Sequence, residues 1–295
     1  MLVFSFSTLQ QRPVEQTHDF IFNSIDASFM GNGYTSVSYF KTLEDMGSNE
    51  DFWGWITEVT PQYLYQHAWF NGTEFGPDFR GTKWRFLQNN LVVQRPRMRQ
   101  IRVQREDCEV PRRMSSSTFG GLLANGSYEG TNFRSRDGLG DCYPPMSKAT
   151  IDESGHWGVI MVNGSVVKKA MPYRSAKELG TSGFNSRATA TPTSYEGGGY
   201  LQEFPLGLSN AQYAAMLRGL QQHGWTDRQT RAIIFDTTIY NLELNTFLNL
   251  RIAFEFQPHG FVLSYVKLRT ARMGYIRQQD LILLLLDGDP ASFRV

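Results

Sequence analysis

Large apolar residues recur at helical spacing in the first hundred residues of the chain. They follow an i, i+3, i+4, i+7 pattern, which is one face of a helix: Phe52, Trp55, Ile56 and Val59. Ser48 precedes them by the spacing of a capping box with Asp51, and Pro61 follows them. The pattern predicts a short helix that begins after Ser48 and ends at Pro61.

A second helical stripe lies in the last third of the chain. It consists of Tyr213, Met216, Leu217 and Leu220. Ser209 and Gln212 have capping-box spacing in front of it, and Gly224 follows it as a stop signal. We interpret this stripe as part of the hydrophobic core.

Strict alternation of apolar and polar residues marks the strands. Residues 248–256 alternate most clearly, with apolar side chains at every even position, which predicts a half-buried antiparallel strand. Ile233, Phe235 and Ile239 mark a preceding strand, and residues 258–260 form a turn into a further one. Residues 91–105 also alternate, which predicts a strand with one polar face.

An Asn-Gly pair separates two further strand-like runs. Residues 156–162 alternate, Asn163-Gly164 follows, and Ser165-Val166-Val167 continues the pattern. This is a strong hairpin signal. Two Gly/Ser-rich stretches, between Cys108 and Cys142 and over 180–199, are expected to be long loops. Helices interspersed with hairpin-connected strands indicate an α+β fold with an antiparallel sheet.

Composition excludes several classes of protein. A net charge of +1 gives no basic field for nucleic acid. The longest apolar run, 281–286, has six residues and is too short to span a bilayer. We find no nucleotide-binding, zinc-protease or hydrolase motif, and the five histidines are scattered. The sequence therefore predicts neither an enzyme nor a metal or cofactor site.

One carboxylate interrupts an apolar strand. Asp236 lies within the run that Ile233, Phe235 and Ile239 mark. A buried carboxylate needs a partner. We expect a structural ion pair with Arg231 or Arg251.

Arginine outnumbers lysine 22 to 7, and seven arginines lie between residues 95 and 113. One interpretation is a strand and loop surface with solvated guanidinium groups. The other is a subunit interface formed by Arg97, Arg99 and Arg102, because arginine suits carboxylate pairing between chains.

The two cysteines and three sequons bear on the compartment. Cys108 and Cys142 are compatible either with a disulfide or with two free, buried thiols. Asn71, Asn125 and Asn163 each begin an Asn-Gly-Ser/Thr acceptor, and Asn-Gly favours exposed turns. Together these features favour an oxidising, extracytoplasmic location.

Several segments, in the same order along residues 40–269, carry a family signal. The sequence around residue 225 reads Trp225-Thr226-Asp227-Arg228-Gln229-Thr230-Arg231-Ala232, followed by Asp236, Tyr240 and Asn241. Upstream lie the Arg97-Met98-Arg99-Gln100-Ile101-Arg102-Val103 run, Cys108-Glu109-Val110-Pro111, Cys142-Tyr143 and His156-Trp157-Gly158. This set resembles the extracytosolic domain of the polycystin cation channels.

The resemblance implies a fold and a role. Such a domain has helices packed on an antiparallel sheet with a projecting hairpin, and four copies form a lid over a cation pore with calcium permeation in several members. By position, Cys108 and Cys142 would be the family's disulfide pair. The cysteine-bounded segment and residues 180–199 both look longer than is usual for the family.

The same resemblance implies boundaries and partners. Residues 1–39 would follow a first transmembrane helix, 40–272 would be the domain, and 273–295 would approach a second transmembrane helix. We therefore expect a homotetramer in the plasma, ciliary or flagellar membrane, with this segment outside the cell. The alternative is an anchoring module whose long loops bind an extracellular filament or matrix glycoprotein. A polycystin-1-like subunit of a mixed complex fits less well.

Overall fold

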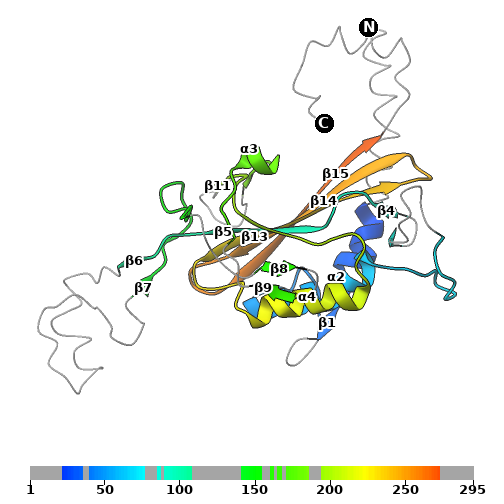
Figure 1. Cartoon of the computed structure of the whole chain (residues 1–295), viewed down its shortest axis with the longest axis horizontal. Coiled ribbons are helices and arrows are strands. Elements are labelled where there is room, and N and C mark those ends of the chain that lie inside the picture. Colours follow the sequence, from blue (N-terminus) through cyan, green and yellow to red (C-terminus); the bar gives the residue numbers. More distant parts are fainter. Residues whose placement is uncertain are drawn as a thin grey trace, which may run out of the picture.

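The computed structural model describes residues 22–35, 40–76, 85–87, 90–107, 141–154, 160–162, 165–167, 171–185 and 194–272. Within these ranges no helix is both long and apolar enough to cross a membrane. The α+β class predicted from the sequence is confirmed, because helices lie beside sheets whose described strand pairs are antiparallel (Figure 1).

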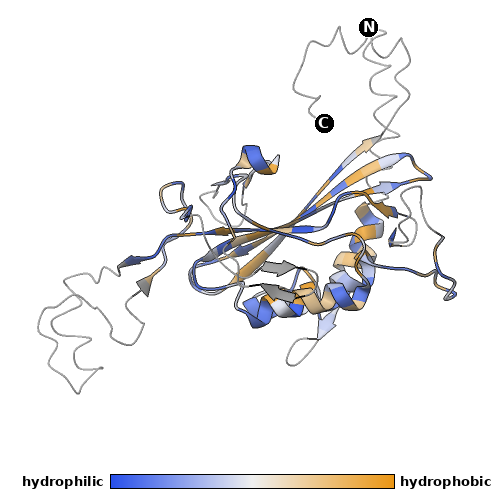
Figure 2. Cartoon of the chain, in the orientation of Figure 1, coloured by the Kyte–Doolittle hydropathy of each residue, from blue (hydrophilic) through white to orange (hydrophobic). Residues whose placement is uncertain are grey.

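A seven-stranded sheet forms the centre of the described fold. Its main path runs β12 (Tyr200–Glu203), β5 (Arg97–Arg102), β13 (Thr230–Asn241), β14 (Thr246–Phe256) and β15 (Val262–Arg272). β4 (Asn90–Val92) pairs with β13 and with β3 (Arg85–Phe86). β13 and β14 are the long hairpin that the alternation predicts, with Phe235 opposite Ile252. Figure 2 shows this alternation along the long strands.

Two helices, α2 (Asn49–Leu64) and α4 (Asn210–Gln222), cover one face of the sheet (Figure 1). Their apolar stripes join the even-numbered side chains of β14 in one core cluster, as with Trp55, Leu217 and Phe254. Both predicted N-caps are confirmed, because the Ser48 and Ser209 hydroxyls accept from backbone amides three residues later. Both helical stripes are therefore core, as the sequence predicts for the second one.

The predicted end of the first helix is wrong. α2 runs through Pro61 to Leu64, and both residues are buried. An interior proline weakens a helix, because it lacks an N–H and its ring crowds the preceding turn, but a contact from the second helix supports the last turn. Asn210 Nδ2 donates to Pro61 O at 2.7 Å.

The sequence predicts that the domain starts at residue 40, but residues before this position already belong to the core. A helical turn over 22–25 leads into a π-helical turn, η1 (Asp26–Met30), and then into β1 (Tyr34–Thr35), which pairs with β2 (Phe40–Lys41). Ile25, Phe29 and Tyr34 belong to the same core cluster as α2.

Smaller two-stranded units accompany the central sheet and its two helices. β8 (Ile160–Val162) pairs with β9 (Ser165–Val167) in the register that Asn163-Gly164 predicts, and β6 (Glu106–Asp107) pairs with β7 (Asp141–Cys142). The stretch from 180 to 199, expected to be a loop, contributes the pair β10 (Phe184–Asn185) and β11 (Ser194–Tyr195). A helical turn, α3 (Ala176–Leu179), precedes it.

The second face of the sheet is covered in part. Ile101, Ile234 and Ala253 form a small apolar cluster with Tyr195 of β11, against which Met146 packs. β5 is therefore enclosed on both faces near its end. This arrangement determines how far the arginine side chains of β5 are buried.

A polar anchor at the base of the cysteine-bounded segment

The arginines of β5 do not form a surface. Arg99 and Arg102 are buried within the chain, and the Arg97 side chain is 14% exposed. The subunit-interface hypothesis for these three residues is therefore wrong for Arg99 and Arg102, as is the solvated alternative. The physical reason is the position of β5 between β12 and β13, with residues 196–198 bound to Arg99 on one face and Asp227 and Asp152 beside Arg102 on the other.

Arg102 binds the turn that precedes β13. Its Nη1 donates to Asp227 Oδ1 at 2.8 Å and its Nη2 donates to Gln229 Oε1 at 2.6 Å. Its Nε lies 3.8 Å from Asp152 Oδ2. The planar guanidinium thus holds three separate polar side chains, which a lysine ammonium could not do in the same geometry.

The turn itself is built around Asp227. Its Oδ1 accepts from the backbone N of Gln229 at 3.1 Å and of Thr230 at 3.2 Å, which is an Asx-type turn. Gln100 Nε2 donates to Trp225 O and to Thr230 Oγ1, both at 2.8 Å. The two segments that carry the family signal therefore meet in space and hydrogen-bond to each other.

Arg231 extends this network to the residues that follow Cys142. Its Nη2 donates to Tyr143 O at 2.7 Å and its Nε donates to Pro144 O at 3.0 Å. Burial lowers the pKa of Arg231, while Tyr195 and Asp227 act in the opposite direction. Arg228 lies over the Tyr143 ring at 5.0 Å.

Cys142 lies in β7, where Glu106 is its partner across the ladder. Cys142 is in a disulfide. Cys108 is the only other cysteine of the chain but lies outside the described residues, so the Cys108–Cys142 pair stays a prediction. We call the network of Arg102, Asp227, Gln229 and Arg231 the polar anchor. It holds residues 143 and 144, which directly follow Cys142 and the end of β7, against the sheet.

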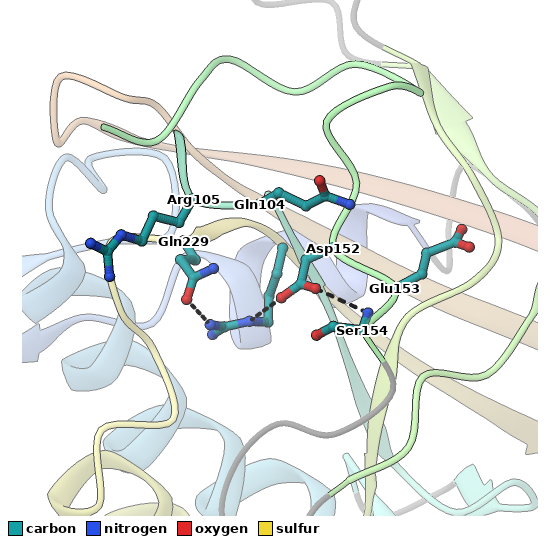
Figure 3. A pocket seen from close by; sticks show the side chains of 7 residues that line it. Gln104, Arg105, Asp152, Glu153, Ser154 and Gln229 are labelled. Carbon is teal, nitrogen blue, oxygen red and sulfur yellow. Dashed lines mark hydrogen bonds and ion pairs between the residues drawn. The ribbon is translucent and has the colours of Figure 1, made fainter. Parts of the chain in front are cut away.

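A hollow of about 640 Å³ opens beside the polar anchor (Figure 3). The side chains that line it are Arg102, Gln104, Arg105, Asp152, Glu153, Ser154 and Gln229. Asp152 Oδ1 accepts from Ser154 N at 3.0 Å, which fixes that carboxylate near Arg102. The lining carries hydrogen-bond donors and acceptors, and its two arginines are balanced by two carboxylates. Such a surface is suited to contact with polar groups.

Asp236 has the arginine partner that its position predicts. Arg251 Nε donates to Asp236 Oδ1 at 2.6 Å, and Arg97 Nε lies 3.9 Å from Oδ2. Arg231, the other arginine considered, binds the carbonyls after Cys142 instead. The register of three adjacent strands decides this, because Asp236 is opposite Arg97 on β5 and Arg251 on β14.

Arg99 is held by main-chain carbonyls. Its Nη1 donates to Glu196 O at 2.7 Å and Gly198 O at 2.8 Å. Burial lowers the pKa of Arg99 to about 10, against the influence of Asp236. Gly199 has a φ of +152°, and a Cβ there would lie 2.6 Å from Gln100 O.

The remaining residues of the family signal are structural or lie outside the described residues. Tyr240 Oη donates to Asn245 Oδ1 at 2.7 Å, and Asn241 Nδ2 donates to Asn90 Oδ1 at 2.9 Å, so both close the β13–β14 end of the sheet. Asn71 lies exposed in a tight loop. His156, Trp157, Gly158, Asn125 and Asn163 lie outside the described residues.

Sequence reasoning missed Asp152 and the glycines of residues 197–199 as parts of this region. Asp152 follows Ile151, which bridges to Val103 of the β5 end, but no short-range pattern announces that contact. The sequence pattern assigns the glycine run to a loop. Three consecutive glycines before a strand signal a close approach of backbone, and here Gly199 approaches Gln100 of β5, whereas Gly197 approaches Thr181 and Gly198 approaches Tyr173.

Comparison of the sequence with known proteins indicates a family. The family model described as the polycystin domain matches residues 42–274. Human polycystin-2-like protein 1 is 28% identical over 85% of this chain and 26% of its own length. Zebrafish (Danio rerio) polycystin-2 is 27% identical over 79% of this chain and 21% of its own length. Human polycystin-1 is 26% identical over 83% of this chain and 5% of its own length.

The chain thus spans about a quarter or less of these curated relatives. The polycystin domain model matches well over half of the chain, and that span contains β5, the turn at Asp227 and Arg231. On this evidence the chain belongs to the polycystin domain family.

Proposed function

We propose that the chain is the extracellular domain of a polycystin-type cation channel, where it supports subunit assembly and couples outside events to the gate. Membership of the family is the first support. The observation that carries the proposal is the polar anchor, because the residues that resemble the channel-type subunits converge on the base of the cysteine-bounded segment.

An anchor of this kind has a mechanical use. Buried guanidinium groups that bind the chain after Cys142 tie those residues to the sheet, so a displacement of these residues is passed to the sheet. Arg231 links residues 143 and 144 directly to β13, the central strand. We propose that the chain assembles as a homotetramer in the plasma or ciliary membrane and that Cys108 and Cys142 form a disulfide.

Two supports favour the extracellular side. Cys142 is in a disulfide, and disulfides persist in oxidising compartments. Asn71 begins a sequon in an exposed turn, where a glycan can be attached.

The test separates folding from assembly. In the longer channel protein that this proposal requires, Arg231→Gln removes the clamp on residues 143 and 144, and Arg218→Gln on the exposed side of α4 is the control. We expect Arg231→Gln to lower the fraction of tetramer on native gels and Arg218→Gln to leave it unchanged. Thermal unfolding of the purified chain shows whether the Arg231 variant is folded.

The opposite result is equally clear. If the purified, disulfide-intact chain fails to self-associate, and deletion of the whole domain leaves tetramers intact, the assembly role is wrong. If deletion of 112–140 abolishes binding to an extracellular filament and leaves assembly and currents unchanged, the anchoring alternative replaces it.

A further inference from the structure

The loop after α2 ends in two exposed aromatic side chains. Trp69 is 40% exposed and Phe70 is 88% exposed, whereas Phe75 at the base of the same loop is buried. Burying an aromatic side chain of this size is worth about 1.5–3 kcal/mol. Two neighbouring aromatic side chains that are exposed to water therefore indicate a contact with another group.

The loop is a tight hairpin. Ala68 bridges to Glu74, and Phe75 N donates to His67 O at 2.8 Å. Trp69 N donates to Thr73 O at 2.8 Å, and Gly72 N donates to Trp69 O at 2.9 Å. Gly72 has a φ of +82°, so this is a three-residue loop in which a left-handed glycine forms the bulge.

A glycosylation acceptor occupies this loop. Asn71 and Thr73 are its first and third residues, and Asn71 Oδ1 accepts from Thr73 N at 3.0 Å. Nδ2, the atom that carries the sugar, has no hydrogen-bond partner among the described residues. The Asn71 side chain is thereby folded back toward the neck of the hairpin, where Trp69 and Thr73 face each other.

The Trp69 ring is held in place from below. Its centroid lies 4.9 Å from that of Phe75 with the two planes at 81°. The Arg85 guanidinium in turn lies over Phe75 at 5.8 Å. A ring that is fixed and still 40% exposed is a ready platform, because its ordering cost is already met within the fold.

We propose that the Trp69 ring is the docking platform for the first N-acetylglucosamine of a glycan on Asn71. A pyranose has an apolar face of polarised C–H groups, which is complementary to the negative face of an aromatic ring. The sequon lies in the same five residues as the exposed tryptophan, so the attachment point and the platform are in one turn. This inference rests on the extracellular location in the proposed function.

The contact gives the exposed aromatic residue a role in the folded protein. Stacking of the sugar covers apolar surface at the loop. Because the covalent link makes the interaction intramolecular, even a weak attraction populates the stacked state. We expect the glycan to stabilise the hairpin through Trp69 and not through Phe70, which lies at the apex.

The experiment uses the full 295-residue chain secreted from mammalian cells. Occupancy of Asn71 is measured by peptide mass spectrometry. The shift in Tm between glycosylated chain and Asn71→Gln is then compared in wild type, Trp69→Ala and the matched control Phe70→Ala. We expect the glycan to raise Tm by about 2–4 °C in wild type and Phe70→Ala, corresponding to about one kcal/mol, and by less than half of that in Trp69→Ala.

Two further measurements keep the result independent of loop folding. Trimming the glycan to one N-acetylglucosamine should preserve the shift, because only the first sugar touches the ring. The N-acetyl methyl protons of that sugar should show an upfield ring-current shift that disappears in Trp69→Phe or Trp69→Ala and persists in Phe70→Ala.

Each failure points to a different error. If Asn71 is occupied and the Tm shift is the same in Trp69→Ala, the platform is wrong and the extracellular location stands. If Asn71 is unoccupied in the longer protein at its native membrane, the platform is wrong, whereas the extracellular location is wrong only if an antibody against the chain fails to label intact cells. If the unglycosylated chain binds phosphatidylcholine vesicles through Trp69, the aromatic loop is a membrane contact and the proposal is overturned.

Discussion

Replacing Arg102 by methionine tests whether the polar anchor stabilises the fold. The change removes two charge-assisted hydrogen bonds, to Asp227 and Gln229, from a buried side chain and keeps only an unbranched apolar stem. Such bonds contribute about 1.5–3 kcal/mol each, and breaking a buried ion pair costs about 3–5 kcal/mol. The Asp227 side chain is 30% exposed and keeps its backbone donors, so its desolvation penalty is modest.

The expected cost is therefore at the lower end, about 3 kcal/mol, or a fall in Tm of about 6–12 °C for a domain of this size. The assay is urea unfolding of the secreted, disulfide-intact chain. Arg218→Met, on the exposed side of α4, is the control and should change stability by less than about 0.5 kcal/mol.

A double-mutant cycle with Asp227→Asn isolates the pair. We expect a coupling free energy of about 1.5–3 kcal/mol, because the two side chains are in direct contact at 2.8 Å. Arg102→Lys should recover only part of the loss, since a single ammonium cannot satisfy Asp227 and Gln229 together. A loss below about 1 kcal/mol in Arg102→Met, or full recovery in Arg102→Lys, would refute the reasoning.

Three other predictions follow from buried or strained groups. Tyr195→Phe removes a 2.6 Å hydrogen bond to the buried Glu255 carboxylate and should cost about 1–3 kcal/mol in urea unfolding, with an unchanged value contradicting the pairing. Burial opposes ionisation of Asp51, but bonds from Lys41 Nζ and Gly47 N outweigh it and hold its pKa below 3.8. This stabilisation is present above about pH 4 and is lost as the pH falls through the folded pKa, so Asp51→Asn should flatten the acid limb of a Tm-against-pH profile. Gly199→Ala places a Cβ 2.6 Å from a strand carbonyl at a φ of +152° and should lower Tm by several degrees, whereas the same change at exposed, unstrained Gly207 should not.

The elements that the sequence predicts correctly share a local cause. α4 begins where Ser209 caps the amide of Gln212, three residues away. The β13–β14 hairpin follows from period-two alternation that each strand carries by itself. In each case the deciding interactions lie within one turn of helix or one strand, so the pattern along the chain contains them.

The errors have a different cause. Pro61 is a local stop signal, yet α2 continues to Leu64, where its last turn is buried and Asn210, far away in the sequence, donates to the Pro61 carbonyl. The arginines of β5 look like exposed polar positions, because the local pattern cannot reveal what covers them. The carbonyls of Glu196 and Gly198 bind Arg99 on one face of the strand, and Asp227 and Gln229 bind Arg102 on the other.

By itself the sequence determined the α+β class, the two core helices, the long hairpin and the need of Asp236 for an arginine. Only the tertiary structure decided that this arginine is Arg251. It also decided that Arg102 binds the Asp227 turn and that Arg231 binds the carbonyls after Cys142. The physical reason is that capping and alternation depend on neighbours along the chain, whereas a guanidinium binds whatever acceptors the register of the sheet and the path of the covering segments bring within about 3 Å.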